Sequence, residues 1–168
     1  LSYSTIGNQK PIGICGSGII DLLAQMRLNG WINIAGELNP EASRRIVFLP
    51  QENQYATIYA FPEESASGET LYFSQTDIHQ YLDTKAAAFT MLECLTESAG
   101  ISMDALAHFY LSGAFPAHSD LESAITIGIF PDLPRDRYAV LRNSSLDGAR
   151  KLLLDRSQLE EAKKILDH

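Results

Sequence analysis

The second half of the chain alternates between strand-like and helix-like segments, and this alternation constrains the fold more than any other feature. Residues 107–111 and 138–141 are short apolar runs with the length and composition of buried strands. Segments with helical spacing accompany them at residues 120–126, 144–154 and 158–167. Strands that alternate with helices pack as a sheet covered by helices. The sequence therefore predicts an α/β fold.

The first half predicts two helices with a small sheet between them. Apolar residues at helical spacing predict helices over residues 19–29 and 76–98, the second capped by Thr76. Between them, residues 44–73 include runs that alternate between apolar and polar side chains, as strands with one buried face do. We predict that residues 37–73 form a β-meander inserted into an otherwise single domain.

The charge and the cysteines narrow the classes of partner and cofactor. The 168 residues carry a formal net charge of −8, which disfavours non-specific binding to nucleic acid and to anionic membrane surfaces. No apolar run is long enough to cross a bilayer. Cys15 and Cys94 form no CxxC pair, so they predict neither a zinc site nor an iron–sulfur cluster within this segment. We expect buried free thiols, no bound metal or cofactor, and a reducing, cytoplasmic setting.

The glycine-rich segment before the first helix is a candidate ligand site. Gly13-Ile14-Cys15-Gly16-Ser17-Gly18 directly precedes residues 19–29. Free backbone amides at a helix start favour an anion, so those of Gly16, Ser17 and Gly18 are candidates to hold one. The segment lacks the Gly-Lys-Ser/Thr of a P-loop and does not match the dinucleotide fingerprint. The alternative interpretation is a tight turn that lets the helix pack closely.

Two further candidates follow the predicted strands. Ser112-Gly113-Ala114-Phe115 begins where the first strand ends, and Asn143 with Ser144 follows the second. Ligands of α/β folds collect at the carboxyl ends of strands, and small residues there let a flat group lie against the backbone. The alternative interpretations are a plain strand-to-helix turn and a helix cap at Asn143 or Ser144.

Taken in order along the chain, five segments resemble the C-terminal domain of the reductive activators of corrinoid proteins. These are ferredoxin-containing proteins with an actin-like ATPase domain. The resemblance covers nearly all of the chain apart from a variable stretch at residues 37–68. The matching segments are Thr5-Ile6-Gly7 with Pro11 and Gly13-Ile14-Cys15-Gly16-Ser17-Gly18-Ile19-Ile20-Asp21, Gln75-Thr76-Asp77-Ile78 with Lys85-Ala86-Ala87, Leu111-Ser112-Gly113-Ala114-Phe115, Ile127-Gly128-Ile129-Phe130-Pro131-Asp132, and Asn143-Ser144-Ser145-Leu146-Asp147-Gly148-Ala149.

The resemblance implies an actin-like, ribonuclease-H-like ATPase subdomain, with residues 1–168 as the C-terminal part of the ATPase domain. In that family a [2Fe–2S] ferredoxin domain and two Asp-Gly-Thr phosphate loops come earlier in the chain. ATP, Mg²⁺ and the cluster are therefore expected in the full-length protein and not in this segment, which is expected to be inactive alone. The family uses ATP to drive electron transfer from the cluster to inactive cob(II)alamin on a corrinoid protein, which is the expected partner.

The resemblance also implies a nucleotide site, with adenosine against the first strand end and the amides of the glycine-rich segment near the ribose or phosphates. Its residues are Gly16, Ser17, Gly18, Ser112, Gly113, Ala114, Phe115, Asn143 and Ser144. The family usually has glycine where this chain has Ala114, Pro116 and Arg142, and the larger residues would narrow the adenosine shelf. The alternative function is therefore a nucleotide-free binding or dimerisation module of the same fold, with a homodimer as its assembly. A sugar- or acetate-kinase-like transferase shares the fold, but the ordered segments favour the other two functions.

Overall fold

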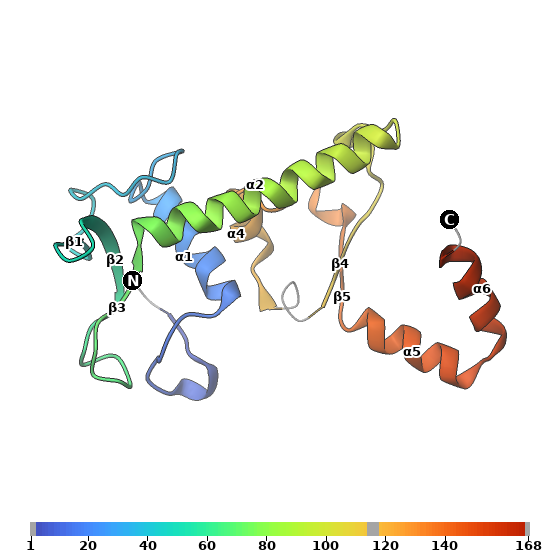
Figure 1. Ribbon diagram of the computed structural model, residues 1–168, viewed down its shortest axis with the longest axis horizontal. Helices are drawn as coiled ribbons and strands as arrows, with labels where there is room; N and C mark the ends of the chain where they lie inside the picture. Colours follow the sequence, from blue (N-terminus) through green and yellow to red (C-terminus); the bar gives the residue numbers. More distant parts are fainter. Residues whose placement is uncertain (1–2, 114–117, 167–168) are drawn as a thin grey trace. The chain divides into compact units, whose positions relative to one another are not determined.

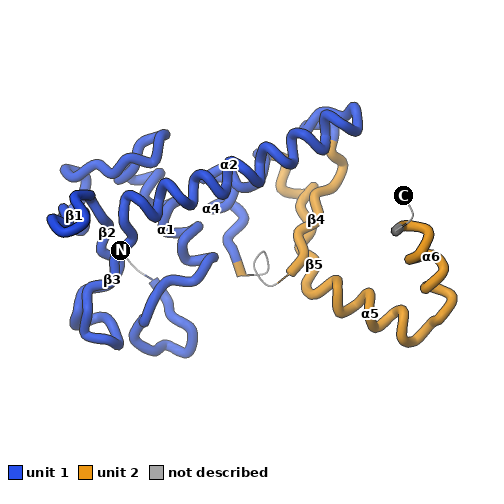
Figure 2. Tube along the Cα trace, in the orientation of Figure 1, with its two compact units in different colours: residues 1–105, 119–132 blue, residues 106–118, 133–168 orange. Residues whose placement is uncertain are grey.

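The computed structural model describes residues 3–113 and 118–166, and Figure 1 shows their helices and strands. The chain divides into two compact units (Figure 2). Unit 1 comprises Leu1–Ala105 and Ser119–Asp132, and unit 2 comprises Leu106–His118 and Leu133–His168. Each unit is built from one of the two patterns in the sequence: the meander with its flanking helices in unit 1, and the paired strands in unit 2.

The meander of unit 1 is a three-stranded antiparallel sheet. Its strands pair in the order β1-β2-β3, with bounds β1 (Ile46–Leu49), β2 (Gln54–Ala60) and β3 (Leu71–Ser74). Ile46 pairs with Thr57 and Thr57 with Phe73, so these three residues lie in one row across the sheet. The predicted meander is confirmed. It forms a sheet of its own within unit 1.

Among the described residues, three helices complete unit 1, together with two short 3-10 turns. They are α1 (Gly16–Leu28), α2 (Gln75–Ser98) and α4 (Leu121–Thr126), with η1 (Ile6–Asn8) and η2 (Met103–Ala105). Figure 1 shows α2 continuing directly from β3. The first helix begins at Gly16, earlier than predicted, because the glycine-rich segment itself takes up helical geometry.

The core of unit 1 forms where α1, the meander and the start of α2 meet. Its cluster of buried side chains is Leu22, Leu23, Met26, Ile32, Leu38, Ile46, Phe73 and Ile78. Gly36 lies against this cluster with φ +80°, and a Cβ there would overlap the Leu82 side chain. Both the backbone angle and the contact therefore require glycine at this position.

Unit 2 contains the pair of strands predicted in the second half. β4 (Phe109–Ser112) and β5 (Tyr138–Leu141) pair in parallel, with Phe109 opposite Tyr138 and Ser112 opposite Leu141. The turn η3 (Arg135–Arg137) leads into β5, and α5 (Ser144–Leu154) and α6 (Ser157–Leu166) follow it. The second strand has the predicted bounds, whereas the first begins and ends slightly later than residues 107–111. Only Leu111 among the eight strand residues is buried, because two strands cannot enclose a core by themselves.

Both cysteines are exposed, so the prediction of buried thiols is wrong. Cys15 directly precedes the first residue of α1, and Cys94 lies on α2, whose only buried residues are Ile78 and Thr96. In the described part of the chain, no helix combines the length and apolarity that crossing a membrane needs. In the same residues, no three His, Cys, Asp or Glu side chains gather as potential metal ligands.

Candidate functional site

The parallel pairing of β4 and β5 brings the two predicted strand-end segments together. The Gly113 N–H donates to the Arg142 carbonyl at 2.9 Å, which extends the pairing beyond the last strand residue. The Ser112 and Ser144 hydroxyls are hydrogen-bonded to each other across the strand ends. Four predicted site residues, Ser112, Gly113, Asn143 and Ser144, thus lie at the carboxyl edge of one sheet, where α/β folds bind ligands.

Asn143 acts as the cap of α5. Its side-chain oxygen accepts a hydrogen bond from the Leu146 N–H at 3.0 Å, and its carbonyl accepts one from the Asp147 N–H at 3.0 Å. The predicted helix cap is therefore confirmed, with Asn143 rather than Ser144 in the role. Its side-chain amide nitrogen remains the group that could donate to a ligand.

Gly113 provides the open floor of this edge. Its φ is +107°, a region that L side chains rarely adopt, and among the described residues a Cβ built there would meet no atom within 4 Å. As far as residues 3–113 and 118–166 show, a flat group could approach the backbone at this strand end. Ala114 and Phe115, the other two residues of the predicted shelf, lie outside the described residues.

The predicted residues Gly16, Ser17 and Gly18 form the first turn of α1 and belong to unit 1, whereas the strand-end residues belong to unit 2. Gly18 packs closely: a Cβ there would lie 3.0 Å from the Ile14 side chain. This contact supports the close-packing interpretation of the glycine-rich segment. It leaves the anion interpretation as a prediction.

A functional group that the sequence interpretation missed is the thiol of Cys15. Its sulfur lies 3.3 Å from the Ser17 hydroxyl. Hydrogen bonds from the Ser17 side chain and then from the Gly18 backbone amide lower the pKa of this thiol below its ordinary value. The helix start therefore faces a thiol that is biased toward its anion, as amides at a helix start generally favour negative charge. The signal in the sequence was a cysteine directly before Gly-Ser-Gly.

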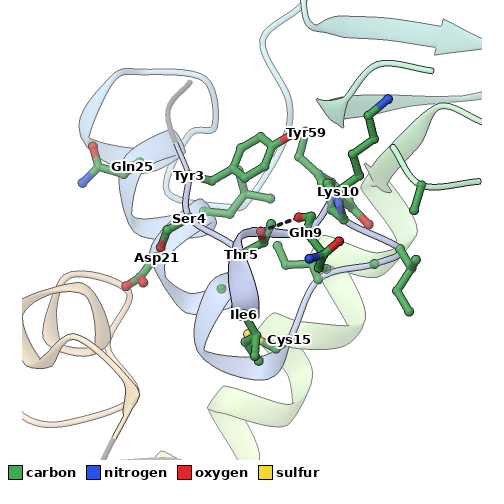
Figure 3. A pocket seen from close by; sticks show the side chains of 17 residues that line it. Tyr3, Ser4, Thr5, Ile6, Gln9, Lys10, Cys15, Asp21, Gln25 and Tyr59 are labelled. Carbon is green, nitrogen blue, oxygen red and sulfur yellow. Dashed lines mark hydrogen bonds between the residues drawn. The ribbon is translucent and has the colours of Figure 1, made fainter. Parts of the chain in front are cut away.

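Cys15 and Gly18 border a cavity of about 810 Å³ in unit 1 (Figure 3). Its wall also includes Asp21, whose Oδ1 is buried without a hydrogen-bond partner among the described residues. Lys10 lines the cavity as well, and its ammonium donates to the Glu63 carbonyl at 2.7 Å. The cavity falls within the size range of small-molecule sites.

The fold places the chain among α/β proteins of the ASKHA, actin-like class. A solved structure described as "Reductive activator for corrinoid, iron-sulfur protein" superposes with a TM-score of 0.87 at 33% sequence identity. The superposition covers 98% of this chain and 26% of that chain.

The chain belongs to the family of C-terminal domains of RACo, the ASKHA domain, whose family model matches residues 1–168. A curated relative, the corrinoid activation enzyme RamQ of Eubacterium limosum, is 27% identical over 164 residues. That match covers 94% of this chain and 28% of the relative. The chain thus spans little more than a quarter of the length of the proteins it resembles.

Proposed function

We propose that this chain is the C-terminal ASKHA segment of an iron–sulfur protein that uses ATP to drive the reductive activation of a corrinoid protein. The observation that carries the proposal is the family match over the whole chain. The similarity to a reductive activator and to a corrinoid activation enzyme supports the corrinoid protein as the partner. ATP use and the iron–sulfur cluster are expectations from the family resemblance.

In this proposal the carboxyl edge of β4 and β5 receives the adenosine. Gly113 offers its backbone without a side chain, and the Ser112–Ser144 hydrogen bond holds the two strand ends together. Because Asn143 is fixed by capping α5, its amide nitrogen has a defined position from which to donate. Such preorganised donors bind a ligand without a further ordering cost.

The test is nucleotide binding by the longer protein that carries this chain, measured with a fluorescent ATP analogue. Gly113→Asp should abolish binding, because it places a carboxylate on the adenosine shelf. Since φ is positive at Gly113, any side chain there also strains the backbone, so a matched control is needed. Gly68→Asp supplies it: Gly68 has φ +72° and a Cβ there would also meet open space.

The outcomes separate the proposal from its alternative. Loss of binding in Gly113→Asp with full binding in Gly68→Asp supports the site. Unchanged affinity for the ATP analogue in Gly113→Asp would show that the adenosine binds at another place. No ATP binding by the unsubstituted longer protein, or corrinoid reduction that proceeds equally without ATP, would leave the nucleotide-free binding module as the function.

A further inference from the structure

The basic residues of unit 1 are few and unevenly placed. Unit 1 contains fifteen acidic residues and only five Lys or Arg. Two of those five, Arg27 and Lys85, line the same cavity of about 250 Å³. No Asp or Glu is found among the described residues of its wall. In a strongly acidic unit, this cavity is therefore a local basic site.

Neither cation has a partner that explains its position. The Arg27 guanidinium and the Lys85 ammonium form no hydrogen bond or ion pair with any residue that the structure describes. The nearby helix ends do not need them, because backbone amides already occupy the terminal carbonyls. At the end of α1 the Gly30 N–H donates to the Arg27 carbonyl at 3.3 Å, and after α4 the Gly128 N–H donates to the Ile125 carbonyl at 2.9 Å.

The wall is shaped around the Lys85 ammonium. Gly128 has φ +73°, and a Cβ there would lie 3.0 Å from Lys85 Nζ. Glycine at this position therefore leaves room for the Lys85 ammonium. Asn33 also lines the cavity, and its side-chain nitrogen holds the Glu37 carboxylate at 2.6 Å. The Glu37 carboxylate is thus already hydrogen-bonded to Asn33.

Lys85 and Gly128 both come from segments that carry the family resemblance, Lys85-Ala86-Ala87 and Ile127-Gly128-Ile129. The proposed function gives neither segment a role, yet the fold brings them to one cavity. We propose that this cavity binds a phosphate-type oxyanion between the Lys85 ammonium and the Arg27 guanidinium. A compact ammonium and a planar fork of N–H donors are together suited to such a group. The residues all belong to unit 1, so the proposal stands independently of ATP binding at the strand ends.

The test uses the 168-residue chain and inorganic phosphate, with ionic strength held constant by sodium chloride. Isothermal titration calorimetry should show saturable binding at one site. Arg27→Gln and Lys85→Gln should each weaken it by about tenfold or more, because each removes a charge-assisted hydrogen bond. Arg44→Gln is the matched control: Arg44 is an exposed cation of the same unit and lines neither cavity, so its loss should leave the affinity unchanged.

The proposal would be overturned by the absence of saturable phosphate binding, by an equal loss in Arg44→Gln, or by wild-type affinity in both cavity variants. Acetate binding as tightly as phosphate would also overturn it, since the site would then be a carboxylate site. Far-UV circular dichroism checks that the variants fold. If either glutamine variant unfolds, Lys85→Arg and Arg27→Lys keep the charge and should retain binding within about tenfold, and their failure to bind would count against the proposal.

Discussion

At the scale of single residues, hydrogen bonds at the start of α1 lower the pKa of a thiol. Cys15 lies immediately before the helix, where backbone N–H groups have no partner within the helix. The Ser17 hydroxyl is the largest cause of its lowered pKa, and the Gly18 amide is the next. Since the thiolate is the reactive form of cysteine, a lowered pKa increases the fraction that reacts at neutral pH.

We predict that Ser17→Ala raises the pKa of Cys15 and slows its alkylation. The variant removes the largest cause of the lowered pKa, so the pH profile should move toward higher pH. The measurement is the rate of iodoacetamide alkylation between pH 6 and pH 10, in a Cys94→Ser background so that one thiol reacts. The chain unfolded in urea gives the reference profile.

Ser102→Ala is the control for this prediction. Ser102 is exposed and its side chain takes part in no hydrogen bond among the described residues. Its removal should leave the alkylation profile unchanged. A Ser17→Ala profile that coincides with that of the unsubstituted folded chain would show that the hydroxyl does not act on the thiol.

At the scale of elements, the start of α2 decides where the meander ends and the helix begins. The Ser74 hydroxyl accepts from the Asp77 N–H at 3.1 Å, and the Asp77 carboxylate accepts from the Ser74 N–H at 2.9 Å. This reciprocal capping box places the cap at Ser74. The sequence predicted Thr76, whose hydroxyl instead donates to the Gln54 side chain at 2.7 Å.

We predict that Ser74→Ala lowers the free energy of unfolding of unit 1 by about 1 kcal/mol, the usual cost of losing a helix cap. Thr76→Ala is the matched comparison and should cost less, because it removes one exposed hydrogen bond. Urea unfolding followed by Trp31 fluorescence measures both. Trp31 is the single tryptophan of the chain and packs against the core of unit 1. If Thr76→Ala lowers the free energy of unfolding as much as Ser74→Ala or more, Thr76 and not Ser74 is the effective cap of α2.

The differences between predicted and observed elements have local causes. Periodicity located every long helix and the meander, because buried faces impose it on the sequence. It could not fix the helix starts, since both Ser74 and Thr76 are good caps. In the structure Ser74 forms the capping box with Asp77, whereas the Thr76 hydroxyl is engaged by Gln54. The sequence predicted Ser112 and Ser144 as site residues after two separate strands. The parallel pairing of β4 and β5 brings the two hydroxyls into contact.

At the scale of the whole molecule, the two units differ in their balance of acidic and basic residues. Unit 1 has fifteen acidic and five basic residues, whereas unit 2 has six acidic and eight basic ones. Unit 1 therefore has a net charge of −10 and unit 2 one of +2, which together give the −8 of the chain. The basic cavity of Arg27 and Lys85 was beyond sequence reasoning, because the two side chains come from helices that are distant in the chain and meet only in the fold.

We predict that the 168-residue chain by itself binds ATP only weakly. In the proposed function the strand ends of unit 2 form the adenosine shelf, whereas the family resemblance implies that the phosphate loops and the Mg²⁺ ligands belong to an earlier part of the protein. Without them the triphosphate must stay largely hydrated beside the strand ends of unit 2. We therefore expect a dissociation constant no tighter than about millimolar, which corresponds to roughly 4 kcal/mol of binding free energy.

Calorimetry with ATP and Mg²⁺ measures this affinity directly, and adenosine is the informative control. If the shelf supplies most of the binding, adenosine should bind the isolated chain about as well as ATP, because the phosphates add little without their loops. Micromolar ATP binding would show that this chain already holds the phosphates. A strong preference for ATP over adenosine would lead to the same conclusion and would direct attention to the amides of Gly16, Ser17 and Gly18 at the start of α1.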